Sequence, residues 1–222
     1  MRPCDPCAHT GARRCYGSRL MVRAVCFDLM DTVLYDPYRE ALAAAIRSAA
    51  PAARAEIAKH RDPTCWPAFE IGEIDEAEFA RRFFREGAEG FSFDLGAFNR
   101  VRRAGYRFLP GVREIVASLE GRALRFVASN YPVWVEEVRE AFALDVLFEG
   151  VYSSHHLGVR KPAREFFDRL MTRIGVGAGE CLFVDDRAEN CEAAAAIGMR
   201  AHVFDGAAGL RARLVGEGLL GA

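Results

Sequence analysis

The stretch Val-Arg-Ala-Val-Cys-Phe-Asp-Leu-Met-Asp-Thr at residues 22–32 joins a short apolar run to a carboxylate. Apart from Arg23, residues 22–27 are apolar and partly β-branched or aromatic, which predicts a buried β-strand. Asp28 follows directly, and the carboxyl ends of parallel strands open into ligand crevices in α/β sheets. The stretch therefore predicts a parallel sheet with Asp28 at its functional edge.

Four more short apolar runs follow along the chain. They lie at Ala123–Ala128, Gly150–Tyr152, Cys181–Val184 and Ala201–Phe204. Helical patterns accompany the later runs, at Val112–Leu119, Trp134–Phe142, Phe166–Ile174 and Cys191–Ile197. Strands that alternate with helices at this spacing predict an α/β fold with a doubly wound parallel sheet.

The segment between the first two predicted strands is too long for a simple crossover. Its pattern is helical throughout, and Asp75 followed by Glu78 is typical of a capped helix start. The predicted helices are Tyr38–Ala50, Ala53–His60, Trp66–Gly72, Asp75–Glu86 and Leu95–Ala104. We expect a core of residues 21–35 and 109–222, and an inserted all-helical cap at residues 36–108 that closes over the sheet edge.

Residues 1–20 differ in composition from the rest of the chain and contain no apolar signal segment. Their cysteines and His9 could bind zinc in principle. A zinc finger needs a second pair of ligands at a defined spacing, however, and none follows. We expect a disordered leader or a misread upstream start, and a cytoplasmic protein. Organelle targeting by this segment is the alternative.

The composition narrows the class of protein. Half of the 222 residues are apolar and the formal net charge is -1, so we expect a soluble globular protein that binds no nucleic acid. No apolar stretch approaches the ~20 residues of a membrane span. Seven cysteines in a chain of this length do not suggest a disulfide framework, and Cys26, Cys181 and Cys191 are expected as buried reduced thiols.

Lysine is rare in this chain, which has 28 arginines and only two lysines, Lys59 and Lys161. Arginine therefore supplies the ordinary surface charge. A lysine directly after Arg160 suggests a position that needs a compact ammonium group rather than a planar guanidinium.

Polar side chains follow the later predicted strands as well. Ser129 and Asn130 come after the second run, Lys161 after the third, and Asp185 and Asp186 after the fourth. Two adjacent carboxylates repel each other unless a cation lies near them. Mg²⁺ takes oxygen ligands, and we expect them from Asp28, the Met30 carbonyl and Asp186, with Asp185 behind them.

The four polar positions, in this order, resemble those of the haloacid dehalogenase (HAD) superfamily of hydrolases. The resemblance covers about residues 22–214 and implies that Asp28 is a nucleophile that forms an aspartyl-phosphate. Ser129, Asn130 and Thr32 would bind phosphoryl oxygens, and Lys161 would neutralise developing charge. The expected substrate is a small-molecule phosphate ester, hydrolysed with Mg²⁺.

One position departs from the pattern of this superfamily. Most of its phosphatases carry a second Asp, the general acid, two residues after the nucleophile, where this chain has Met30, and Asp31 stands where glycine is usual. Haloacid dehalogenases also lack that acid, but they work without metal and usually have neutral residues at the positions of Asp185 and Asp186. A dehalogenase-like hydrolase and a catalytically weak binding scaffold are the alternatives.

A closer similarity links the chain to plant plastid FMN hydrolases. It rests on residues 27–32, 66–76, 130–134 and 160–162, and that group shares the Met-Asp-Thr form of the first motif. The resemblance implies FMN or a related flavin-pathway phosphate as substrate. Trp66 and Phe69 in the aromatic-rich cap are the candidates for a flavin-binding wall.

Overall fold

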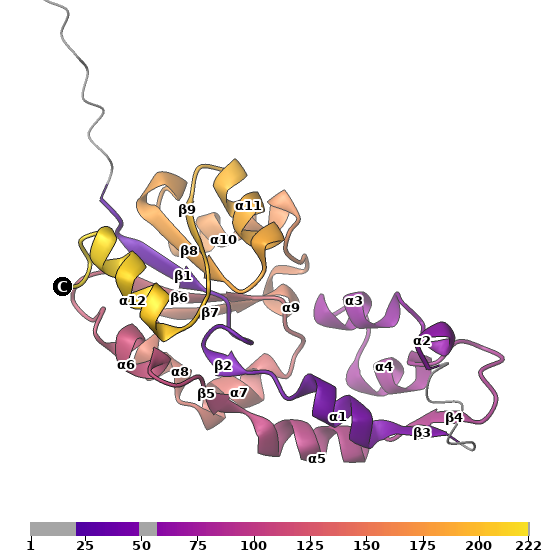
Figure 1. The fold of residues 1–222 in the computed structure, drawn as a ribbon. Helices are drawn as coiled ribbons and strands as arrows, with labels where there is room; N and C mark the ends of the chain where they lie inside the picture. The colour runs from indigo at the N-terminus through magenta and orange to yellow at the C-terminus, as the bar shows by residue number, and fades with distance from the viewer. Residues whose placement is uncertain (1–20, 49–56, 222) are drawn as a thin grey trace, which may run out of the picture.

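The fold is built around a parallel sheet. The computed structural model describes residues 21–48 and 57–221, and in these residues five strands form the sheet in the order β7-β6-β1-β8-β9 (Figure 1). The strands are β1 (Ala24–Phe27), β6 (Leu124–Ser129), β7 (Gly150–Ser153), β8 (Cys181–Asp185) and β9 (Arg200–Val203). All five predicted strands are confirmed within two residues at each end. β1 is central and pairs with β6 and β8, so three carboxyl ends meet at one edge.

Alternate residues of each strand point to opposite faces of the sheet, which gives two apolar clusters. In β1, Ala24 and Cys26 belong to the cluster with α10 (Arg164–Ile174) and α11 (Ala188–Ala196). Val25 and Phe27 belong to the larger cluster, to which the helices of the other face contribute. Those helices are α6 (Val112–Ala117), α7 (Val135–Ala141), α8 (Leu144–Leu147) and α12 (Ala207–Gly216). Helices on both faces confirm the predicted doubly wound α/β class.

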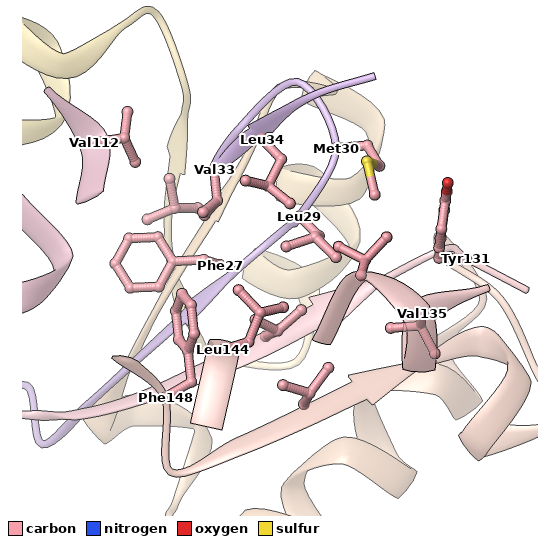
Figure 2. Close-up of a cluster of buried hydrophobic side chains, with 14 of the residues drawn as sticks. Phe27, Leu29, Met30, Val33, Leu34, Val112, Tyr131, Val135, Leu144 and Phe148 are labelled. Carbon is pink, nitrogen blue, oxygen red and sulfur yellow. The ribbon is translucent and has the colours of Figure 1, made fainter. Parts of the chain in front are cut away.

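The larger cluster reaches up to the loop that follows Asp28. Figure 2 shows Leu29, Met30, Val33 and Leu34 in this cluster, together with Phe27. The side chain of Met30 is 8% exposed, so its thioether belongs largely to the apolar interior. The loop is therefore fixed by packing as well as by its backbone.

The inserted segment leaves and re-enters the core at one place. β2 (Leu34–Tyr35) pairs antiparallel with β5 (Arg107–Phe108). Beyond this pair, α1 (Tyr38–Ala45) packs along α5 (Leu95–Gly105). The segment also contains α2 (Ile57–His60), α3 (Cys65–Glu70) and α4 (Glu76–Arg82), and Figure 1 shows it to the right of the sheet in violet and magenta. We propose that the domain boundaries at residues 35/36 and 108/109 correspond to this paired crossing.

The expectation that the cap is all-helical was wrong in one respect. The helix predicted over residues 38–50 ends at Ala45, and β3 (Ile46–Ser48) pairs antiparallel with β4 (Phe91–Phe93). Three residues are too few for a recognisable alternation in the sequence, and the pairing depends on residues more than forty positions apart. The predicted leader at 1–20, its cysteines and residues 49–56 lie outside the described residues.

Aromatic side chains fill the interior of the inserted segment and join it to the core. Phe69 stacks on Phe79 with ring centroids 4.9 Å apart, and its edge meets Trp134 at 4.8 Å. Trp134 directly precedes α7 of the core. Edge-to-face pairs of this kind add about 0.5–1.5 kcal/mol beyond area burial.

The composition predicted buried reduced cysteines and no membrane-spanning segment. Cys26, Cys181 and Cys191 are buried free thiols, as expected, and so is Cys65. Among the helices of residues 21–48 and 57–221, none combines the length and apolar character needed to cross a bilayer.

We expect Phe69→Ala to lower the free energy of unfolding by about 3–5 kcal/mol, because it removes a buried aromatic ring from a packed cluster. Urea denaturation followed by tryptophan fluorescence measures this loss. Val146→Ala, at a side chain 79% exposed, is the control and should change stability by less than about 0.5 kcal/mol. A loss below about 1 kcal/mol for Phe69→Ala would mean that the cluster relaxes around the missing ring.

Candidate active site

A buried ammonium group lies at the centre of the carboxyl edge. Lys161 Nζ donates to Asp28 Oδ1 at 2.7 Å, to Asp185 Oδ2 at 2.6 Å and to the carbonyl of Ala128 at 2.8 Å. These three acceptors use all three N–H donors of an ammonium group. The acceptors come from the ends of β1, β8 and β6, so Lys161 ties the three central strands together.

Asn130 positions this lysine. Its Oδ1 accepts from the backbone N–H of Lys161 at 2.7 Å, and its Nδ2 donates to the Lys161 carbonyl at 2.9 Å. The sequence suggested that the Asn130 amide binds a phosphoryl oxygen. Asn130 also lines the cavity, and its Nδ2 has a second N–H, so the contact with a phosphoryl oxygen stays a prediction beside this positioning role.

Burial and the neighbouring charges shift the pKa values of Lys161 and Asp28. Burial alone would lower the pKa of Lys161, but the adjacent carboxylates of Asp28 and Asp185 raise it above its ordinary value. Burial raises the pKa of Asp28 to about 7 against the opposing charge of Lys161, and Asp185 adds to the rise. The ammonium group is therefore firmly charged, whereas Asp28 needs further positive charge to be fully ionised near neutral pH.

Three carboxylates converge where such a charge would bind. Asp28, Asp185 and Asp186 each have an oxygen within 4.8 Å of the others. Asp185 is already bonded to Lys161, to Asn190 Nδ2 at 2.9 Å and to the Arg187 N–H at 2.9 Å. Asp28 and Asp186 are thus the carboxylates with oxygens left for a cation, and hard oxygen donors of this kind fit Mg²⁺. Burial, then the neighbouring Asp185, raise the pKa of Asp186.

Two buried hydroxyls near the edge differ in their access to a ligand. Ser129 Oγ has no hydrogen-bond partner among the described residues, and Ser129 lines the cavity next to Asp28. Such an unsatisfied group suits an oxyanion ligand. Thr32 Oγ1 is also without a partner in the described part of the chain, but Thr32 is fully buried and does not line the cavity. The structure thus places Thr32 behind the cavity lining rather than in it.

A cavity of about 440 Å³ opens above these groups, between the core and the inserted segment. Its walls contain Asp28, Met30, Asp31, Asp36, Tyr38, Arg61, Pro63, Trp66, Pro67, Glu70, Ser129, Asn130, Tyr131, Arg160, Lys161, Asp186, Arg187 and Asn190. The volume is within the usual ~300–1,000 Å³ of small-molecule sites. The inserted segment contributes Tyr38 and Trp66 to this lining, together with polar residues such as Arg61 and Glu70.

The two predicted aromatic residues separate in the structure. Trp66 lines the cavity, where its Nε1 donates to Glu70 Oε1 at 2.7 Å and its ring meets Tyr38 at 4.8 Å. Phe69 is 1% exposed and lies behind this wall. The expectation that Phe69 contacts a substrate is therefore corrected, since its ring packs against Phe79 and Trp134 instead.

Comparison with known proteins now identifies the family. Residues 22–198 match the haloacid dehalogenase-like hydrolases. The chain is a HAD-like hydrolase. It is 34% identical over 182 residues to the chloroplastic flavin mononucleotide hydrolase 1 of Arabidopsis thaliana, which covers 82% of this chain and 71% of the relative. It is also 29% identical over 137 residues to the sesquiterpene phosphatase astK of Aspergillus oryzae, over 60% and 69% of the two chains.

Solved HAD structures share the fold. A HAD-like hydrolase from Porphyromonas gingivalis superposes with a TM-score of 0.66 at 23% identity, over 88% of this chain and 98% of that one. A HAD enzyme from Bacteroides thetaiotaomicron, solved with magnesium and inorganic phosphate, gives 0.65 at 16% identity, over 83% and 95%. These likenesses confirm the architecture around the sheet edge.

Several cavity residues of this HAD-like hydrolase escaped the sequence analysis. Tyr38, Arg61 and Tyr131 line the walls, and Asn190 secures Asp185 from the first turn of α11. Asn190 lies five residues after Asp185, on the helix that follows the strand. This position next to the strand end is the only signal in the sequence that could have identified Asn190. Arg61 and Tyr38 belong to a segment whose placement depends on tertiary packing.

Lys161→Met should lower the free energy of unfolding by about 3–5 kcal/mol at pH 8 in excess chelator, because it leaves buried carboxylates without their cation. The folded-state pKa of Asp28 is raised above its unfolded value, and losing Lys161 raises it further. The loss should therefore be largest at high pH and shrink as the pH falls through about 7, where Asp28 of the wild-type protein takes up a proton. Chemical denaturation at several pH values measures it.

Lys59→Met, at the other lysine of the chain, is the matched control, since its side chain is exposed. It should change stability little at any pH. A loss for Lys161→Met that is independent of pH would show that the charges of Asp28 and Asp185 are not what Lys161 balances.

Proposed function

We propose that this protein is a Mg²⁺-dependent phosphomonoester hydrolase that acts through an aspartyl-phosphate on Asp28. The observation that carries the proposal is the group of three carboxylates, Asp28, Asp185 and Asp186, beside the buried Lys161. Two negative charges at Asp28 and Asp186 without a second cation would be strongly unfavourable. A metal-independent dehalogenase has no need of the adjacent acidic pair Asp185 and Asp186.

Each residue of the site then has a defined task. Asp28 attacks phosphorus, and Lys161 holds the attacking carboxylate and stabilises charge that develops in the transition state. The unpartnered hydroxyl of Ser129 is free to donate to a phosphoryl oxygen. Asp28, the Met30 carbonyl and Asp186 would hold the metal, with Asp185 behind them. When bound, Mg²⁺ supplies charge neutralisation for both the phosphate and the nucleophile.

We expect phosphate release to stop in excess chelator and to return on addition of Mg²⁺. Asp28→Asn should reduce release to background while the protein stays folded, because an amide does not displace an alkoxide from phosphorus. A phosphate-release assay over a panel of phosphorylated metabolites measures this. Beryllofluoride should protect the wild-type protein against thermal unfolding but not the Asp28→Asn variant.

Two outcomes would contradict the proposal. Hydrolysis by Asp28→Asn at the wild-type rate would remove Asp28 as the nucleophile. Turnover of 2-haloacids in excess chelator, without phosphate release from any ester, would establish the dehalogenase alternative.

For the substrate we propose FMN or a related flavin phosphate. The support is the similarity to a relative named as a flavin mononucleotide hydrolase, together with the aromatic wall of the cavity. A flat isoalloxazine ring needs an apolar surface, and Trp66, Tyr38 and Tyr131 present rings to the cavity. The phosphate would then lie at Lys161 and Ser129.

Trp66→Ala should raise the KM for FMN by about 2–10-fold, the equivalent of one aromatic contact, while the KM for a small sugar phosphate changes little. Steady-state kinetics on both substrates measures the difference. Phe69→Ala is the comparison, because it removes a ring behind the wall and should show no preference between the two substrates. Equal effects of Trp66→Ala on both substrates would limit Trp66 to a packing role.

A further inference from the structure

The proposed reaction lacks one chemical group at its usual place. An alkyl phosphate releases an alkoxide, which needs a proton, and a positioned acid contributes about 10²–10⁴-fold to the rate. Met30 supplies none, because its thioether carries no proton and lies in the apolar cluster of Figure 2. Another group that faces the cavity must donate the proton.

Besides Asp28 and Asp186, three carboxyl groups line the cavity: Asp31, Asp36 and Glu70. Both oxygens of Glu70 are engaged, one by Trp66 Nε1 and the other by Arg160 Nε at 2.9 Å. Asp31 is exposed, and its Oδ1 accepts the backbone N–H of Asp36 at 3.1 Å. A proton donor in a water-excluding site should be partly buried and not paired with a cation, which disfavours both.

Asp36 meets these conditions. Its side chain is partly buried, and its Oδ1 accepts only the backbone N–H of Tyr38, at 3.0 Å, in the part of the chain that the structure describes. Within the same residues it forms no ion pair with a basic side chain. One oxygen is therefore available to carry a proton toward the cavity.

The loop after Asp28 explains how Asp36 reaches this cavity. Leu29 O accepts from the N–H groups of Val33 at 2.9 Å and Leu34 at 2.8 Å, and Asp31 N donates to Leu34 O at 2.6 Å. Asp31 has a φ of 57°, in the left-handed region that reverses the chain. The chain thus turns back on itself, and the Asp36 N–H is bonded to Asp31. Asp36 is therefore held by the loop that carries the nucleophile, although it is the first residue beyond the β2–β5 crossing.

We propose that Asp36 is the catalytic acid of this hydrolase, in the role that Met30 does not fill, and that its carboxylate then acts as the base in the second step. This inference rests on the proposed phosphatase function. In the first step, an Asp28 oxygen bonds to phosphorus, the bond from phosphorus to the alkyl oxygen breaks, and that oxygen takes the proton of Asp36. In the second, Asp36 takes a proton from water as the water oxygen bonds to phosphorus, and the electrons of the breaking bond return to Asp28.

The surroundings of Asp36 suit a proton donor. Burial raises the pKa of Asp36 to about 6; Asp31 and Glu40 add to the rise, and Arg187 opposes it. The hydroxyl groups that experience its charge are those of Tyr38, Tyr106 and Tyr131. At pH 7 roughly a tenth of such a carboxyl group is protonated, against roughly a thousandth at the ordinary pKa of aspartate.

The test compares an alkyl with an aryl phosphate in Asp36→Asn, with Mg²⁺ present. For FMN, kcat/KM should fall by about 10²–10⁴-fold. For p-nitrophenyl phosphate, whose leaving group needs no proton, kcat/KM should remain close to wild type. Loss of the base should slow the second step, so one equivalent of p-nitrophenolate should appear in a burst. Asparagine can still accept the Tyr38 N–H, and thermal denaturation checks that the variant folds.

Matched variants separate Asp36 from its neighbours. Glu40→Gln removes a nearby carboxylate outside the cavity and should leave both substrates unchanged. Asp31→Asn and Glu70→Gln should affect FMN and p-nitrophenyl phosphate by similar factors. If either of these two variants shows the selective loss on FMN and Asp36→Asn does not, the assignment to Asp36 is wrong.

A measurement on the wild-type protein needs no variant. The ratio of kcat/KM for FMN to that for p-nitrophenyl phosphate should fall about tenfold per pH unit above about pH 6, because the protonated acid is needed for FMN alone. A flat ratio from pH 5 to 8 would overturn the inference. If the wild-type protein hydrolyses neither ester, the proposed function fails. If it hydrolyses both and Asp36→Asn matches it, only the role of Asp36 fails.

Discussion

The ammonium group of Lys161 holds the rest of the site in place. It is fully buried, which is costly for a charge, and two carboxylates and one carbonyl compensate it at hydrogen-bond distance. Because those three acceptors end three adjacent strands, the charge balance of the site and the spacing of the sheet edge depend on the same contacts. Asn130 bonds to both the N–H and the carbonyl of Lys161, so its amide helps to determine where the positive charge lies.

The contacts of Lys161 also explain why the adjacent carboxylates of Asp185 and Asp186 have different roles. Asp185 is saturated by Lys161, Asn190 and a backbone N–H, and it serves as an internal counter-ion. Asp186, one residue further on, faces the cavity and has lone pairs to offer. Successive side chains along a strand point to opposite faces. Asp185 therefore supplies a structural charge, and Asp186 supplies one that faces the cavity.

Much of the fold could be predicted from the sequence, because each strand of the sheet is a compact apolar run followed by a polar residue. Asp28, Ser129 and Asp186 were identified by that pattern, and the rarity of lysine drew attention to Lys161. All four residues come together in the structure. The failures have a common cause. The β3–β4 pair and the packing of Phe69 against Trp134 depend on contacts between distant segments, which leave no mark in local sequence. Asn130 was identified, but its bonds to the Lys161 backbone were not, since an amide can bond to a ligand or to a backbone with equal ease.

The pairing of β2 with β5 has a consequence for how such a protein can diversify. Leu34 lies opposite Phe108 and Tyr35 opposite Arg107, so the chain departs from the core and returns to it at adjacent positions. The segment between β2 and β5 is therefore a loop whose two ends are fixed next to each other. Each doubling of the length of such a loop costs only about 0.6 kcal/mol in closure entropy. The core can therefore carry insertions of very different size and sequence at this point. The catalytic edge stays constant while the exchangeable module above it is rebuilt for another ligand.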